Sequence, residues 1–266
     1  MGISPSEIQL RVIGILLGLA AGERNGGPIR MALQLAESLA VQKCFNRQDI
    51  LKRFLDWWQK EGFDTGPVAA DVFRLILTGI PAEEASAKVH QTSGARTAGC
   101  NPAHRISPLA MAAFLADEEL AHFAMQEAAL THWDPLAGDV AAAVVILCRS
   151  LIRGHSWGDA CQRAVEGRTH LSKAAFQAKA DVPLKKDRFA PDVLRAAIHF
   201  IQTNTSFDAV LTAAIEFVGP ANYCPVLVGA IGGAQWGAAA IDRQSLAHCD
   251  ILPRVYSSAQ TLAGMW

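Results

Sequence analysis

Residues 226–241 read VLVGAIGGAQWGAAAI, and this stretch decides the fold. Its apolar residues do not alternate as in a strand, and Gly229, Gly233 and Gly237 follow one another at intervals of four residues. Glycine costs about 1 kcal/mol relative to alanine inside a helix, so three in one row need a compensating gain. A residue without a Cβ lets another backbone approach closely. The stretch therefore predicts a helix in tight contact with a second helix.

The rest of the chain also has helical periodicity, and alternating strand patterns are nearly absent. A first helical segment opens at Pro5 and runs to about Ala21, and its apolar stripe comprises Ile8, Val12, Ile15, Leu16 and Leu19. Asn46 and Asp134 are residue types that cap helix N-termini. The chain has no tandem repeat, no low-complexity linker and no composition shift that marks a boundary. The sequence predicts one all-α domain over residues 1–266.

Composition excludes several classes of protein. The chain has 266 residues, of which 51% are hydrophobic and 18% charged, so it is too apolar for a disordered protein. Its 24 Lys and Arg against 25 Asp and Glu give no global attraction to nucleic acid or to an anionic membrane. The apolar run at residues 12–22 is too short to span a bilayer. Six scattered cysteines without a Cys-x-x-Cys pair are typical of reduced thiols, and we expect a cytoplasmic protein.

Five segments, taken in order, resemble the motifs of one enzyme family, the ADP-ribosylglycohydrolases. They are GILLGLAAGE (14–23), MALQLAESL (31–39), GCNPAHRISPLAM (99–111), ALTHWDPLAGDVAAAVVILCRSLIRG (129–154) and GAIGGAQWG (229–237). The first is similar to the family's opening G-x-x-x-G-x-x-x-G-D motif, and the second to the helix that follows its D-D-T metal motif. The resemblance implies a compact orthogonal bundle of helices. It also implies two magnesium ions and cleavage of the bond between C1″ of ribose and a side chain or small molecule.

The chain departs from the family at the metal ligands. The family's D-D-T motif falls on residues 27–29, which are Gly, Pro and Ile, and its D-x-D-T motif falls on residues 220–223, which are Pro, Ala, Asn and Tyr. The opening G-D has become Gly22-Glu23. Magnesium needs hard oxygen ligands, usually with carboxylates among them. We therefore expect no magnesium cofactor, and we do not expect the family's reaction to run by the family's mechanism.

The polar residues left near these motifs define a candidate site. Glu23 and His104 are the candidate catalytic pair, because a desolvated carboxylate has a raised pKa and an imidazole titrates near neutrality. The candidate ligand-binding residues are Asn25, Asp64, Asn101, Arg105, His132, Asn222, Tyr223 and Cys224. Residues 25–27, Asn-Gly-Gly before a helix start, would also offer backbone N–H groups to a phosphate or carboxylate.

Each candidate also has a purely structural interpretation. Asp64 would begin a helix, His104 would be a core histidine, and Arg105 would form a buried ion pair with a carboxylate. His132 precedes a helix N-terminus and would support it. Cys224 would be a buried, inert thiol unless a base lies beside it.

Three functions remain open. The first is a metal-independent protein that acts on or binds a small molecule, such as a ribosyl or nucleoside compound, by acid/base chemistry. The second is a catalytically inactive relative with a binding or structural role. The third is a magnesium-dependent hydrolase whose ligands lie elsewhere in the chain. In the first case the partner is a small molecule, not nucleic acid or membrane, and a homodimer stays open.

Overall fold

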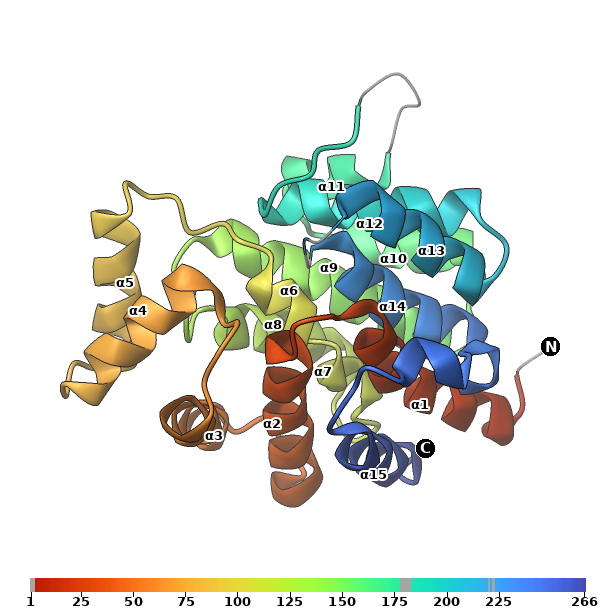
Figure 1. Ribbon diagram of the computed structural model, residues 1–266, viewed down its shortest axis with the longest axis horizontal. Coiled ribbons are helices and arrows are strands. Elements are labelled where there is room, and N and C mark those ends of the chain that lie inside the picture. Colours follow the sequence, from red (N-terminus) through yellow and green to blue (C-terminus); the bar gives the residue numbers. More distant parts are fainter. Residues whose placement is uncertain (1–2, 178–182, 220, 222) are drawn as a thin grey trace.

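The computed structural model describes residues 3–177, 183–219, 221 and 223–266, and these residues form α-helices joined by loops (Figure 1). The helices are α1 (Pro5–Gly22), α2 (Gly27–Gln42), α3 (Arg47–Lys60), α4 (Gly66–Leu77), α5 (Ala82–Thr92), α6 (Asn101–Arg105), α7 (Pro108–Met111), α8 (Leu120–Ala128), α9 (Pro135–Ile152), α10 (Trp157–Val165), α11 (His170–Phe176), α12 (Ala190–Thr203), α13 (Phe207–Val218), α14 (Cys224–Trp236) and α15 (Leu252–Ala263). Three 3-10 turns accompany them: η1 (Asp117–Glu119), η2 (Ala238–Ala240) and η3 (Arg243–Leu246). Within the described ranges there is no β-strand, so the predicted all-α fold class is confirmed.

Helices α9 and α14 lie at the centre of the molecule (Figure 1). Helices α10 to α13 cover one side of this pair, and α2, α3 and α15 lie on the opposite side. α9 is buried along nearly its whole length, because α8, α10 and α14 all pack against it. Its length and apolar composition would suffice to cross a membrane, but 83% of it is buried inside the protein.

The glycine row of α14 meets a matching glycine row on α1. A Cβ built on Gly229 would lie 2.0 Å from the carbonyl oxygen of Gly18, and one built on Gly18 would lie 2.0 Å from that of Gly229. The Gly14 and Gly233 pair is equally close, with a Cβ on Gly233 only 1.9 Å from the Gly14 carbonyl oxygen. The predicted close helix contact is confirmed, and its partner is the N-terminal helix.

Gly237 does not belong to this row, because α14 ends one residue before it. Its φ of 77° lies in the region that favours glycine, and its N–H donates to the carbonyl oxygen of Gly233. The expected continuation of the helix to residue 241 is therefore wrong. The third glycine stops the helix instead of extending its contact face.

Side-chain caps set several helix starts as expected. The Asn46 side chain accepts a hydrogen bond from the Asp49 N–H at 3.1 Å, and Asp134 accepts one from the Leu136 N–H at 3.0 Å. Both bonds satisfy amide groups that the first turn of a helix leaves without an intrahelical partner. α9, the central helix, therefore begins where Asp134 and Pro135 predict.

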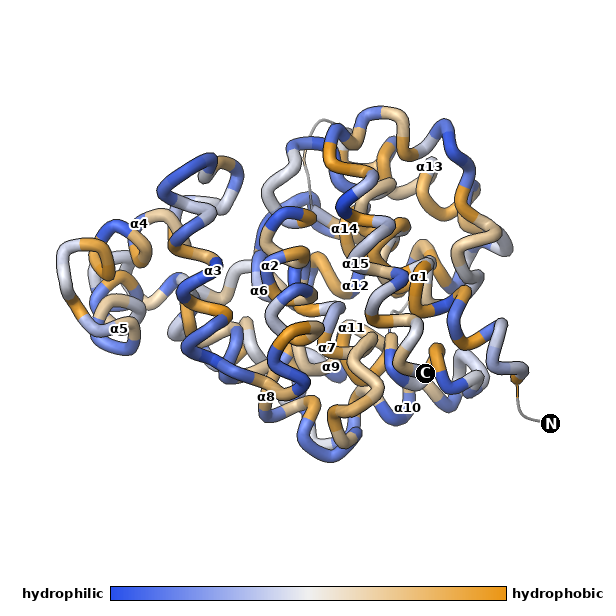
Figure 2. The backbone as a smooth tube through the Cα atoms, turned by 90° about the horizontal axis from the view of Figure 1, so that it is seen from below, coloured by the Kyte–Doolittle hydropathy of each residue, from blue (hydrophilic) through white to orange (hydrophobic). Residues whose placement is uncertain are grey.

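Helices α4 and α5 project from the rest of the molecule as a pair (Figure 2). Val72, Ala85 and Val89 form a small apolar cluster between them, separate from the large core that joins the other helices. Phe73 of α4 instead packs toward α3, with its ring centroid 6.5 Å from that of Phe54. One side of α4 thus anchors the pair, and α5 packs on the outer side.

Candidate functional site

The turn between α1 and α2 is built around Glu23. The Glu23 side chain is buried, and its Oε1 accepts hydrogen bonds from the N–H groups of Asn25 and Gly26, each at 2.5 Å. Its carbonyl oxygen accepts a bond from Nε2 of His248 at 2.5 Å. Gly26 adopts a φ of 103°, which only glycine takes without strain. Glu23 therefore holds the shape of this turn, whatever else it does.

A polar pocket of about 250 Å³ opens at this turn. Its walls come from α1, the turn, the start of α2, the loop after α3 and the C-terminal loop before α15. The lining residues are Ala20, Glu23, Arg24, Asn25, Gly26, Ile29, Arg30, Phe63, His248, Cys249 and Asp250. We call this cavity the α2 pocket. Of the residues predicted from sequence, Glu23 and Asn25 line it.

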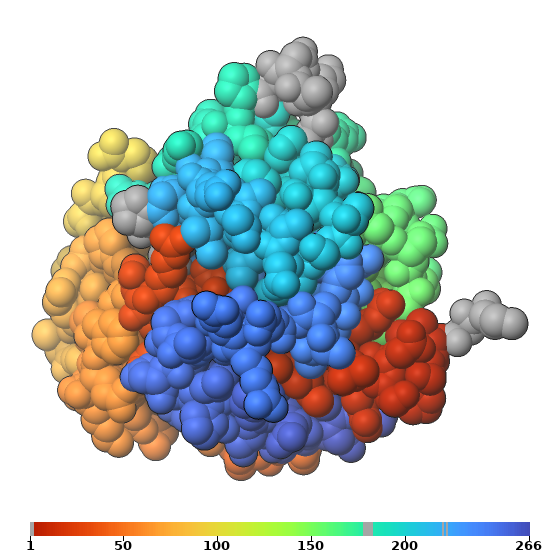
Figure 3. Space-filling view, turned by 45° about the vertical axis from the view of Figure 1, so that its right-hand side comes forward, coloured from red at the N-terminus to blue at the C-terminus, as the bar shows by residue number. Residues whose placement is uncertain are grey.

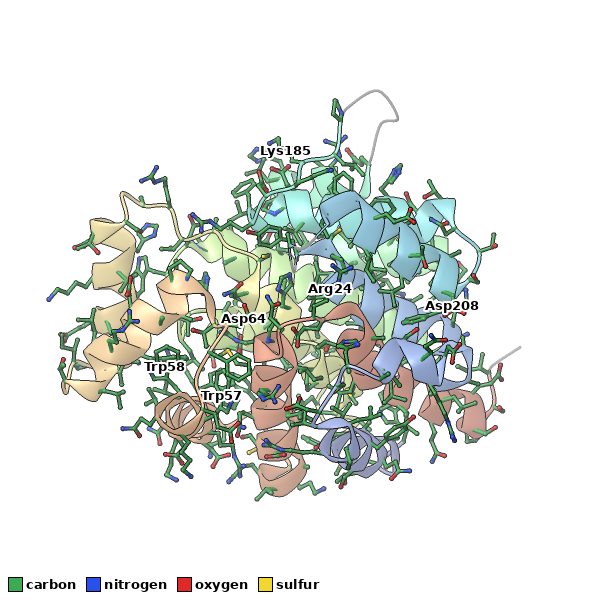
Figure 4. All side chains as sticks on the ribbon, in the orientation of Figure 1. Arg24, Trp57, Trp58, Asp64, Lys185 and Asp208 are labelled. Carbon is green, nitrogen blue, oxygen red and sulfur yellow. The ribbon has the colours of Figure 1, made fainter. Side chains whose placement is uncertain are left out.

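Asp64 and Asn101 lie next to the start of α2 and hold the loop that approaches it. A Cβ on Gly27 would lie 2.3 Å from the Asp64 carbonyl oxygen, so this loop packs directly against the helix. The Asn25 amide donates to Oδ1 of Asp64 at 3.4 Å, and the Asn101 amide donates to the carbonyl oxygen of Thr65. Figure 4 shows Arg24 and Asp64 on the two sides of the α2 N-terminus. Asn25, Asp64 and Asn101 are thus brought together, chiefly by contacts that position the backbone.

His104 is a buried histidine on α6. It bonds to the backbone of Tyr223, and its Nε2 has no hydrogen-bond partner among the described residues. Burial lowers the pKa of His104 to about 3, because a charged imidazole would lose its hydration there. The imidazole is therefore neutral at pH 7, and it lies outside the lining of the α2 pocket.

Arg105 forms the buried ion pair that its structural interpretation expects. Its Nε lies 2.5 Å from Oε1 of Glu127, and its second terminal nitrogen donates to Oγ1 of Thr131 at 2.9 Å. His132 joins the same network, since its Nδ1 lies 2.8 Å from the Thr131 hydroxyl. Burial lowers the pKa of His132 to about 3. The network joins α6 to the end of α8, so these two candidates connect helices.

The last three candidates precede or begin α14. Cys224 is buried with its Sγ 4.0 Å from the Ala214 carbonyl oxygen, and burial raises the pKa of its thiol to about 12. A thiol of that pKa carries almost no thiolate at neutral pH, which is the inert state. Tyr223 is half-buried at the helix N-cap and packs against the core. Asn222 lies outside the described residues.

The residues present do not fit the magnesium pair that the family resemblance implies. In the described part of the chain, no group of three His, Cys, Asp or Glu side chains is placed to hold a metal ion. The D-D-T position is the first turn of α2, where Gly27, Pro28 and Ile29 offer no side-chain oxygen. Glu23 stands at the remaining acidic position, and its Oε1 already accepts two backbone amides.

Sequence reasoning missed several residues of the α2 pocket. They are Arg30, Phe63, His248 and Asp250. The sequence does contain a signal for Arg30, because a charged residue at the start of an apolar helix is unusual and marks a candidate site. His248 and Asp250 gave none, since their position beside Glu23 depends on a contact between residues 225 apart in the chain.

A model of the ADP-ribosylglycohydrolase family matches residues 4–265 of this chain. The fold is similar to a solved structure described as an ADP-ribosylglycohydrolase-related protein complex, with a TM-score of 0.78 and 22% sequence identity. That similarity covers 98% of this chain and 99% of the other, and at this identity it shows the fold alone. No curated protein matches the chain. The family match extends over nearly the whole sequence, and we conclude that this chain belongs to the ADP-ribosylglycohydrolase family.

Proposed function

We propose that this protein binds a small molecule in the α2 pocket without magnesium. One observation carries the proposal: a polar pocket is present at the helix start where the family's first metal motif falls. Ile29, at the third position of that motif, lines the pocket together with Glu23, Asn25 and Arg30. Ligand sites are typically concave with a few convergent polar groups, and this pocket has that character.

Binding without turnover follows from the state of the two candidate catalytic groups. A general base works best when its pKa lies near the working pH, and the pKa of His104 is lowered to about 3 by burial. His104 also does not line the pocket that Glu23 lines. The two groups therefore share no described cavity in which a substrate would meet both.

Metal-free hydrolysis is the second candidate function. The burial of Glu23 in the pocket wall favours it. Glu23 is only 3% exposed, and it lines the pocket. Glu23→Gln and His104→Ala should each abolish turnover under this second function while the melting temperature stays within a few degrees. Unchanged turnover in both variants would exclude it.

A thermal-shift screen tests the binding proposal. The panel comprises ADP-ribose, nucleosides, nucleotides and simple sugars, each with magnesium and with EDTA. We expect at least one compound to raise the melting temperature equally in both conditions. A shift that needs magnesium would restore the family's metal mechanism, and no shift with any compound would contradict the proposal.

Cys249→Phe and Cys44→Phe make a matched pair for locating the binding site. Cys249 lines the α2 pocket, whereas Cys44 is exposed between α2 and α3. A phenylalanine at residue 249 should fill part of the pocket and remove the ligand-induced shift. The same substitution at residue 44 should leave it unchanged. Equal shifts in both variants would place the ligand elsewhere.

A further inference from the structure

Arg30 is an unusually buried cation at the wall of the α2 pocket. Its side chain is 8% exposed, and its guanidinium carbon lies 5.0 Å from the centroid of the Phe63 ring. One terminal nitrogen donates to the Gly26 carbonyl oxygen at 3.1 Å, while Nε has no hydrogen-bond partner among the described residues. The carboxylate of Glu61 is 3.9 Å from Nε, beyond hydrogen-bond distance. Arg30 thus keeps unused donor capacity in a largely desolvated place.

The other terminal nitrogen of Arg30 already holds a carboxylate. It lies 2.6 Å from Oδ2 of Asp250, whose side chain is 72% exposed. Ion pairs with such an exposed partner contribute little to stability, so another oxyanion can replace this carboxylate at small cost. The contact with Asp250 therefore shows the kind of group that Arg30 binds, which is an anionic oxygen at the rim of the pocket.

The start of α2 adds a second source of positive potential to the same pocket. α2 has 16 residues, and its N-cap is Gly26, whose N–H donates to Oε1 of Glu23. Pro28 in the first turn has no N–H, so Gly27 and Ile29 carry the amide groups of this turn. The first turn of a helix presents N–H groups without intrahelical partners, and the helix dipole favours a negative charge there. Gly26 and Ile29, from this end of the helix, line the pocket.

Two acidic residues also line the pocket, and both are engaged. Oε1 of Glu23 accepts the amides of Asn25 and Gly26, and Asp250 is paired with Arg30. Arg24 is the second cation, and its guanidinium donates to the Gly219 carbonyl oxygen at 2.6 Å. The acidic residues thus satisfy groups of the protein, while Arg30 and the first turn of α2 give this wall of the pocket a positive potential.

We propose that the α2 pocket recognises the phosphate or carboxylate group of its ligand through Arg30 and the N-terminus of α2. This inference rests on the proposed binding function and names the ligand class, a small organic anion. It also reverses the charge preference of the family's site, because donors to an anion stand where the resemblance places ligands to cations. Arginine suits this task, since its planar fork matches the geometry of both oxyanions.

Isothermal titration with ribose 5-phosphate, ribose and inorganic phosphate, all in EDTA, tests the ligand class. We expect ribose 5-phosphate to bind at least tenfold more tightly than ribose, because hydrogen bonds between charged groups are roughly twice as strong as neutral ones. Inorganic phosphate should compete with it. Equal affinity for ribose and its phosphate would overturn the inference.

Two variants with opposite expected effects locate the anion. Arg30→Gln should weaken ribose 5-phosphate binding about tenfold or more, because it removes the charged donor. Asp250→Asn should strengthen it about two- to fivefold, because it removes the competing carboxylate at an exposed position. Arg47→Gln is the matched control, since Arg47 forms an exposed ion pair with Glu83 outside the pocket lining. Unchanged affinity in both pocket variants, or the same loss in the control, would overturn the inference.

The binding measurements distinguish failure of this inference from failure of the proposed function. Binding of a neutral nucleoside that Cys249→Phe abolishes and that both pocket variants leave unchanged would keep the function and exclude the anion site. Absence of binding for every compound would contradict both. Because Asp250→Asn changes an exposed side chain, its effect on affinity can be read even if Arg30→Gln does not fold.

Discussion

His104 and His132 are held neutral by burial, and their protonation links the stability of the protein to pH. Burial lowers both pKa values from 6.5 to about 3, so below pH 6.5 the unfolded chain takes up protons that the folded chain does not. Stability therefore falls as the pH drops from 6.5 toward 3, by up to about 1.4 kcal/mol per pH unit for each histidine. Unfolding by urea at pH 7 and at pH 5 measures this loss.

Replacing one histidine isolates its share of the pH dependence. Between pH 7 and pH 5 one such group contributes about 2 kcal/mol of the loss. His104→Gln should therefore lower the difference in unfolding free energy between the two pH values by about that amount. An unchanged difference would mean that His104 titrates normally in the folded protein, which would also revive its role as an acid or base.

The cysteines give a second prediction at the residue scale. Cys44 is exposed, whereas Cys100, Cys148 and Cys224 are buried and burial raises each thiol pKa to about 12. Since the thiolate is the reactive form, a thiol reagent should label Cys44 fast and should not label Cys224 in the native protein. Peptide mass spectrometry after brief labelling identifies the modified residues, with all six thiols labelled in denaturant as the control. Rapid labelling of Cys224 would support the nucleophilic thiol that the sequence left open.

At the scale of elements, the contact between α1 and α14 should tolerate no added methyl group. A Cβ on Gly229 would lie 2.0 Å from a backbone oxygen of α1, and backbone atoms cannot move aside without separating the helices. Gly229→Ala should lower the unfolding free energy by about 3 kcal/mol or more, the upper range for overpacking. Chemical denaturation of the purified variant checks this.

Gly158→Ala is the control for the effect of glycine itself. A Cβ at Gly158 in α10 would meet only the Ser156 hydroxyl at 4.0 Å. Alanine should stabilise this helix by up to about 1 kcal/mol, because it costs less backbone entropy than glycine. If both variants changed stability alike, helix propensity and not the helix contact would explain the glycines.

Local sequence signals predicted where helices form better than they predicted which helices contact each other. Periodicity and the caps at Asn46 and Asp134 gave the helix type and several starts, because these depend on neighbouring residues. The row at Gly229 and Gly233 indicated a close contact, but a glycine row does not name the helix that it meets. Gly237 was assigned to the helix because its positive φ, which ends α14, is invisible in the sequence.

For the whole molecule, the candidate site was predicted only where the family motifs reached it. Glu23 is the last residue of the first motif and Asn25 follows shortly after it, and both line the α2 pocket. Arg105 and His132 matched motif positions as well, yet their contacts connect buried helices. Asp250 comes from the other end of the chain and reaches Arg30 through tertiary packing alone, which single-sequence patterns do not encode. Figure 3 shows segments from the two ends of the chain, red and blue, next to each other on one face of the molecule.

The projecting pair α4 and α5 should open without unfolding the rest of the molecule. Its own cluster of Val72, Ala85 and Val89 is small, and of the two helices α4 reaches the main core, through Ala69 and Phe73. Regions with few buried apolar contacts exchange amide hydrogens through local opening, whereas core helices require global unfolding. In hydrogen-exchange mass spectrometry, peptides from α5 should exchange faster than those from α9, whose residues are nearly all buried.

Val89→Ala distinguishes local from global opening of this pair. The substitution removes buried methyl groups from the small cluster and should destabilise it by about 1–3 kcal/mol. If α5 opens by itself, its amides should exchange roughly tenfold faster in the variant or more, while exchange in α9 and the global unfolding midpoint stay the same. Since 1.4 kcal/mol corresponds to a tenfold change in an opening equilibrium, the size of the effect is measurable. Faster exchange in α9 as well would mean that the small cluster and the main core unfold together.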